Sequence, residues 1–339
     1  MKAGKVSQTI YRRSVRKQLH MEENKEGNKI LWKPSREETC CGIQTKDGEY
    51  VLSASASLFG NEKDLCVFAM AQAANAVVAH GAVTAGVELQ ILLPEFAYES
   101  RIKTMIALAE EKSEVWQIPI MKADVQIVPG IQTTVVCANA LGYVSEDGLV
   151  RSSMAKPAQD IVLLGYAGLE GSLRIKRAKE AELRERFIPA FLNNLESHYD
   201  GIYTDFVTER AATDMISAMH PVAEGGILGA LWELAEGADL GLSVDMRKIP
   251  IRQETIEVCE YFHLNPYQLT SAGCILAVTE NGEELVERLH EENIEAVVIG
   301  YTTDKAERVL MNGGEKRYLD RPAQDELTRF LSSQARDEE

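Results

Sequence analysis

The stretch DIVLLGYAGLEGS, residues 160–172, joins an apolar run of strand length to a glycine-bearing loop and the start of a helical pattern. In that loop Gly168, Gly171 and Ser172 are small, so backbone N–H groups can approach oxygen atoms, and a helix N-terminus adds a favourable dipole. The loop has neither the Gly-Lys-Ser/Thr of a Walker A loop nor GxGxxG spacing. The pattern is typical of an anion cradle or of an ordinary strand-to-helix turn.

Two further glycine-bearing segments follow. MHPVAEGGI, residues 219–227, leads into a helical pattern, and its paired Gly225 and Gly226 permit tight packing or the close approach of a ligand. The third segment, Ser271-Ala272-Gly273, stands at the head of a buried apolar run. Both segments also fit plain turn chemistry, so a ligand site and a turn remain alternatives.

Upstream of the first loop, residues 145–160 are polar (SEDGLVRSSMAKPAQD) and form the best candidate for a domain junction. We expect two α+β domains, residues 1–150 and 151–335, rather than one doubly wound sheet. In the first domain the pattern predicts helices at 5–19, 61–81 and 99–112, a hairpin at Asp47-Gly48, and strands at 85–93, 115–128 and 131–144. In the second it predicts helices at 170–197, 203–218, from Gly225 onward, 251–262 and 281–292, and strands at 239–245, 273–279 and 294–301.

The composition excludes several classes of protein. The 339 residues include 36 Lys and Arg and 52 Asp and Glu, so the formal charge is 36 − 52 = −16, and 45% are hydrophobic, which excludes general disorder. The acidic balance disfavours nucleic acid and anionic membranes as partners, because both need a dense cationic surface. No apolar run approaches the roughly 18–20 residues that span a bilayer.

The N-terminus and the cysteines indicate a cytoplasmic protein. MKAGKVSQTIYRRSVRKQLH has positive charge but no apolar region of a secretory signal. The six cysteines show neither a CxxC pair nor a Cys/His cluster, which favours reduced thiols. The vicinal Cys40-Cys41 pair fits two small packing residues, with a redox or metal role as the alternative.

Together the three glycine segments carry a resemblance. Residues 160 to about 325 resemble the C-terminal domain of the AIR synthase superfamily (PurM, ThiL, SelD, HypE), through GLEGS, MHPVAEGGILGALWELAE and LSVDMRKIPIRQETIEVCEYFHLNPYQLTSAGCILAVTENG. They are most similar to HypE-like, AIR synthase-related proteins of Clostridia. The N-terminal half matches more loosely, through KVSQTIYRRSVRKQL, the helix end at Asn75 to Gly81, ILLPE and VPGI.

The resemblance implies a two-domain PurM-like fold of the α+β class. Members of the superfamily bind ATP at the N-terminal domain, with Mg²⁺ held by Asp side chains, and two chains pair their N-terminal sheets into a central β-barrel. They phosphorylate a carbonyl, carboxyl or amide oxygen, or selenide. This chemistry needs carboxylates because Mg²⁺ prefers hard oxygen ligands.

This chain departs from the family pattern where those carboxylates are expected. Thr39, in Glu37-Glu38-Thr39-Cys40-Cys41, stands where relatives carry a metal-binding Asp. The other departures replace acidic or glycine-rich family segments, and they are Ser53-Ala54, Asn75-Ala76, Lys122-Ala123-Asp124-Val125 and Pro221-Val222-Ala223-Glu224-Gly225-Gly226. Neutral side chains cannot balance Mg²⁺ with triphosphate, so ATP and Mg²⁺ are expected to bind weakly or not at all.

Two hypotheses follow. In the first, the chain is a catalytically degenerate dimeric binding or scaffold protein; in the alternative, it is an ATP-dependent enzyme with a rebuilt site. The resemblance implies that HypE carries its substrate group on a C-terminal cysteine. This chain ends SSQARDEE without a cysteine, so HypE's own reaction is disfavoured. A homodimer is expected, with a heterodimer with an intact paralogue as a further possibility. Asp124 is the candidate metal ligand, and the candidate nucleotide-binding residues are Glu38, Asn75, Lys122, Asp124, Gly168, Gly171, Ser172, Glu224, Gly225 and Gly226.

Overall fold

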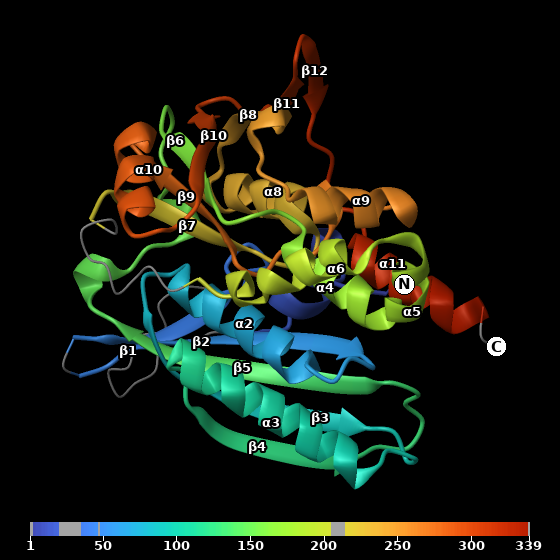
Figure 1. Ribbon diagram of the computed structural model, residues 1–339. Helices are drawn as coiled ribbons and strands as arrows, with labels where there is room; N and C mark the ends of the chain where they lie inside the picture. The colour runs from blue at the N-terminus through green and yellow to red at the C-terminus, as the bar shows by residue number, and fades with distance from the viewer. Residues whose placement is uncertain (1–2, 20–34, 47, 205–213, 338–339) are drawn as a thin grey trace.

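The computed structural model describes residues 3–19, 35–46, 48–204 and 214–337, which form two sheets with helices packed on them (Figure 1). The first sheet has the strand order β1-β2-β5-β3-β4. Its strands are β1 (Cys40–Gln44), β2 (Tyr50–Gly60), β3 (Val83–Leu93), β4 (Ile120–Ile127) and β5 (Thr134–Val144). The hairpin predicted at Gly48 is confirmed, because β1 and β2 pair antiparallel up to Gln44 and Tyr50.

Two helices cover one face of this sheet, and among the described residues no helix packs on its other face. They are α2 (Leu65–Val78) and α3 (Glu99–Trp116). Helix α2 is rich in Ala and almost wholly buried, because it contacts the sheet on one side and the second half of the chain on the other. A single hydrophobic cluster therefore contains Phe68 and Met70 of α2 together with Leu169 and Leu173 from the second half. The two halves share a core.

The second sheet has seven strands in the order β12-β11-β8-β10-β6-β9-β7. They are β6 (Asp160–Leu164), β7 (Ile216–Val222), β8 (Gly241–Asp245), β9 (Cys274–Thr279), β10 (Ala296–Thr303), β11 (Arg308–Asn312) and β12 (Glu315–Tyr318). Alternate residues of β6 point to opposite faces, so Ile161 packs with α8 and Val162 packs with α10. The helices of this half are α4 (Leu169–Ala178), α5 (Glu180–Arg186), α6 (Pro189–Ser197), α8 (Gly226–Ala238), α9 (Gln253–Tyr261), α10 (Gly282–Glu291) and α11 (Glu326–Asp337).

Most predicted elements are confirmed within a few residues, and the helix at 203–218 is wrong in its described part. Residues 205–213 lie outside the described residues, but Ile216–Val222 is strand β7, paired antiparallel with β9. An apolar run of this length fits a buried helix or a strand equally well by periodicity. The contact with the buried strand β9 decides the conformation, and Pro221 is tolerated because β7 is an edge strand.

Other differences are smaller. The strand run predicted at 115–128 begins only at Ile120, because α3 continues to Trp116. The predicted first helix occupies Gln8–Tyr11 and continues as a wider turn over Arg12–Arg16. The hairpin β11–β12 and the helix α11 were not predicted. Within the described ranges, no helix is both long and apolar enough to cross a bilayer.

Candidate functional site

Three positions that lack the family's carboxylates lie close together, between the first sheet and helix α2. Cys40 of β1 is the register partner of Ala54 on β2, and its thiol donates a hydrogen bond to the carbonyl of Ala76 on α2 at 3.1 Å. Ala54 is 2% exposed and Ala76 8% exposed. The hydroxyl of Thr39 beside them is buried and has no hydrogen-bond partner among the described residues. The three substitutions thus form a tight, mostly apolar contact.

Glu38 forms an internal ion pair at the edge of this contact. Its carboxylate lies 3.2 Å from Nε2 of His80, a fully buried residue just after α2, and 3.3 Å from the backbone N–H of Ser153. Burial lowers the pKa of His80, but contact with Cys40 and with the Glu38 carboxylate outweighs burial and raises it to about 10. Burial likewise opposes ionisation of Glu38, yet the hydrogen bond and charge of His80 lower its pKa. At neutral pH this pair is charged.

Asn75 bonds to the second half of the chain. Its amide donates to the carbonyl of Ile202 at 2.8 Å, and its side-chain oxygen accepts from the backbone N–H of Thr204 at 3.0 Å. Asn75 is 1% exposed. All three groups are buried or half-buried, so this residue ties α2 to the segment after α6.

Lys122 and Asp124 lie on β4, at the outer edge of the first sheet (Figure 1). Both side chains are more than half exposed and pair with each other at 2.7 Å, which raises the pKa of Lys122. Their register partners Glu88 and Gln90 lie on β3. With β2, β5 and β3 between them and β1, these two residues are not brought near Glu38 within one chain.

The start of α4, which contains Gly168, Gly171 and Ser172, uses its hydrogen-bond donors for contacts within the second half of the chain. Gly168 has φ +77° and donates its N–H to the Ser271 hydroxyl at 2.7 Å, while the N–H of Gly171 donates to the carbonyl of Thr270 at 3.1 Å. The hydroxyl of Ser172 donates to the carbonyl of Leu169. The first and third glycine segments are therefore bonded to each other.

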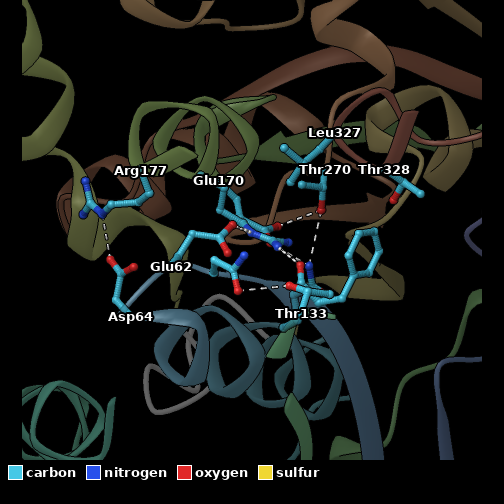
Figure 2. A network of polar contacts seen from close by, with 12 residues as sticks. Glu62, Asp64, Thr133, Glu170, Arg177, Thr270, Leu327 and Thr328 are labelled. Carbon is cyan, nitrogen blue, oxygen red and sulfur yellow. Dashed lines mark hydrogen bonds and ion pairs between the residues drawn. The ribbon is translucent and has the colours of Figure 1, made fainter. Parts of the chain in front are cut away.

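Glu170, in the first turn of α4, organises a buried polar network that the sequence did not reveal (Figure 2). One carboxylate oxygen accepts from the Thr270 hydroxyl at 2.8 Å and the Ala272 N–H at 2.9 Å, and the other accepts from the amide of Gln72 on α2 at 2.7 Å. Burial raises the pKa of Glu170, against the opposing charge of Arg174 one turn further along α4. Glu170 therefore links the start of α4 to α2.

Arg174 and Arg177 extend the network to the loop before α2. The guanidinium of Arg174 lies 3.1 Å from Glu62 and donates to the carbonyl of Phe59 at 2.7 Å. Arg177 pairs with Asp64 at 2.9 Å, as Figure 2 shows. One face of α4 is thus held to the first half by charged hydrogen bonds.

The second glycine segment lies beside a pocket between the halves. Gly225 has φ +94° and donates its N–H to Asp325 at 2.8 Å, and Glu224 accepts from the backbone N–H of Lys5 at 2.8 Å. Gly226 has φ +61° and packs too tightly on the backbone around Gln268 to allow a side chain. The pocket, of about 300 Å³, is lined by Lys5, Ser57, Gln72, Arg174, Glu224, Thr270 and Asp325. Burial raises the pKa of Asp325 to about 7.

The residues present do not fit a magnesium ion. Across the described residues, no group of three or more His, Cys, Asp and Glu side chains could hold a metal. Glu38, the carboxylate beside Thr39, is paired with His80. The candidate metal ligand Asp124 is paired with Lys122 on β4, which three strands separate from β1. The candidate nucleotide-binding residues therefore lie in three separate places: around Glu38 and Asn75, in the glycine segments, and at the β4 edge of the first sheet.

Comparison with known proteins defines the class. Residues 161–311 match the family model "AIR synthase related protein, C-terminal domain". This match and the relatives below confirm the resemblance to the AIR synthase superfamily, whose C-terminal domain matches these residues.

Within that superfamily, the chain is similar to HypE-like hydrogenase maturation proteins. It is 24% identical over 273 residues to a putative hydrogenase expression/formation protein of Methanocaldococcus jannaschii, covering 78% of each chain. It is 25% identical over 190 residues to the carbamoyl dehydratase HypE of Rhizobium leguminosarum bv. viciae, covering 54% of this chain and 52% of the relative, about half its length.

Solved structures confirm the fold. The hydrogenase maturation protein HypE in complex with ATP superposes with a TM-score of 0.64 and 15% identity, over 82% of this chain and 87% of that one. At this identity the likeness establishes the PurM-like fold and no further property.

Proposed function

We propose that this chain is a HypE-like binding or scaffold protein whose inherited Mg²⁺·ATP site no longer supports phosphoryl transfer. The proposal is carried by one observation: the carboxylate of Glu38 lies 3.2 Å from Nε2 of the buried His80, a group that can hold a positive charge beside it. The positive charge of His80 balances the negative charge of the Glu38 carboxylate, as a bound metal ion would otherwise do. Thr39, Ala54 and Ala76 supply no carboxylate to compete with it.

The bonding of the glycine loops supports the same proposal. A phosphate cradle needs backbone N–H groups free to donate. Here the N–H groups of Gly168, Gly171 and Gly225 donate to Ser271, Thr270 and Asp325 instead. The two proposed domains are residues 1–150, for nucleotide binding and dimerisation, and residues 151–335, of PurM C-terminal type. Other contacts join them, among them Glu170 with Gln72 and Arg174 with Glu62.

A homodimer is part of the proposal. The open face of the first sheet carries Ile43, Val51 and Tyr143, which are exposed or half-exposed, beside Lys122 and Asp124 at its β4 edge. A second copy packed on this face would bury the apolar side chains. It would also place the Lys122–Asp124 pair at a chain–chain boundary.

ADP release tests the proposal. The full chain is assayed in a coupled assay with Mg²⁺ or Mn²⁺ across pH, beside an intact HypE-type enzyme as the positive control. We expect no ADP release above background. Metal-dependent turnover would overturn the proposal in favour of the ATP-dependent enzyme that phosphorylates a carbonyl, carboxyl or amide oxygen.

Light scattering tests the dimer separately. A homodimer is expected at micromolar concentration, and a monomer would contradict the shared sheet face. If co-purification from the native cell shows a stable complex with an intact paralogue instead, the homodimer is replaced by the heterodimer.

A further inference from the structure

A second hollow lies at the end of the first sheet where β2 and β3 finish. It has a volume of about 750 Å³ and lies between the loops that precede α2, α3 and β5. The residues used below that line it are Asn61, Lys63, Glu95, Phe96, Tyr98 and Arg101. None belongs to the site described above.

Two aromatic side chains stand at the rim of this hollow, on the loop between β3 and α3. Phe96 is 90% exposed and Tyr98 is 80% exposed. An aromatic side chain buries about 150–250 Å² when it is covered, at roughly 25 cal/mol per Å². Exposing two of them side by side gives up several kcal/mol of burial that a partner can recover. Tyr and Arg are also the residue types that dominate binding energy at protein interfaces.

Two cationic side chains in the hollow remain uncommitted. Neither Lys63 nor Arg101 forms an ion pair within the described ranges. Arg101 makes one side-chain hydrogen bond there, in which its Nη2 donates to the side-chain oxygen Oδ1 of Asn61 at 3.4 Å. By contrast, Arg174 and Arg177 pair with Glu62 and Asp64, which flank Lys63 in the chain. One carboxylate, Glu95, also lines the hollow. In a chain of charge −16, this hollow holds two cationic side chains against one carboxylate, which favours an anionic group there.

We propose that this hollow docks an acidic peptide segment of a partner protein. A carboxylate of the segment would pair with Arg101 and Lys63, and an apolar side chain would cover Phe96 and Tyr98. Phe96 and Tyr98 favour a peptide over a small anion, because both line the hollow yet stay largely exposed, and only a ligand with apolar side chains covers both. The charge favours an acidic segment over a basic one.

Fluorescence anisotropy on the full chain tests the proposal with three short labelled peptides. The probe alternates Asp or Glu with Phe or Leu, and its matched forms carry Asn and Gln, or Lys, in place of the acids. We expect the acidic probe to bind at least about tenfold more tightly than either matched form. Arg101→Glu, and the pair Phe96→Ser with Tyr98→Ser, should each weaken it about tenfold or more.

Lys46→Glu, the same charge reversal on the distant β1–β2 hairpin, is the control and should leave binding unchanged. Unchanged thermal unfolding of the Phe96/Tyr98 variant shows that the fold is intact. Equal binding of all three peptides, or binding insensitive to the aromatic pair, would overturn the proposal. Displacement of the probe by AMP at similar concentration would assign the hollow to a small anion. Loss of dimerisation in the aromatic variant would assign it to a second copy.

Discussion

Replacing Arg174 by alanine should be among the most destabilising single changes in the seam between the two halves. The guanidinium lies 3.1 Å from Glu62 and 4.0 Å from Glu170, and the three side chains are 4%, 2% and 0% exposed. Removal would leave two carboxylates and the carbonyl of Phe59 buried without their cation. Breaking a buried pair from one side costs about 3–5 kcal/mol, so we expect a loss of that size in the free energy of unfolding.

Urea unfolding followed by circular dichroism measures the effect. The matched control is Arg184→Ala, which removes an exposed pair with Glu180 on α5 and should change stability by at most about 0.5 kcal/mol. Adding Glu62→Gln to the Arg174 variant should recover part of the loss, because one uncompensated charge disappears. A loss below about 1 kcal/mol for Arg174→Ala would refute the assignment of this network as the tie between the halves.

Three further outcomes are expected. The pKa of His80 is about 10 in the folded state against an ordinary 6.5. The protonated His80 therefore stabilises the folded state fully below pH 6.5, and the difference in unfolding free energy between the native chain and His80→Gln should shrink as pH rises toward 10. A pH-independent difference in urea midpoint would contradict this. Burial opposes ionisation of Glu233, but the charges of Lys5, His220 and Arg36 lower its pKa from 4.5 to about 2. The stability that the Glu233 carboxylate contributes should therefore be lost as pH falls from 4.5 toward 2, and Glu233→Gln should show no such loss in acid titrations. Ala54→Asp, at a position 2% exposed, should lower the free energy of unfolding in urea by at least about 3 kcal/mol, whereas Ser55→Asp on the open face should lower it by under about 1 kcal/mol. Similar losses for the two variants would show that the site still accepts a carboxylate.

Local sequence patterns were enough to predict most of the fold. The Ala-rich run of α2, the hairpin at Gly48 and the glycine loop after β6 each carry their own signal within a few residues. The pattern failed at Ile216–Val222, where pairing with β9 decides the conformation. It also missed β11 and β12, short strands with little apolar alternation.

The candidate site was less predictable, because its contacts join residues distant in the chain. Glu62 and Arg174 are 112 residues apart, and Glu38 and His80 are 42 apart. The sequence marked Glu38 through the resemblance but gave no partner for it. A charged residue between small and apolar neighbours, as Glu170 is in GLEGSL at the start of α4, is the one local signal that could have indicated a buried polar network.

Isothermal titration calorimetry of Mg²⁺·ATP into the full chain tests the central claim most directly. With His80 supplying the charge beside Glu38, and with the glycine loops bonded to one another, we predict no saturable heat up to millimolar nucleotide. A magnesium-dependent dissociation constant in the micromolar range, lost in Glu38→Gln and retained in Lys46→Glu, would contradict the account.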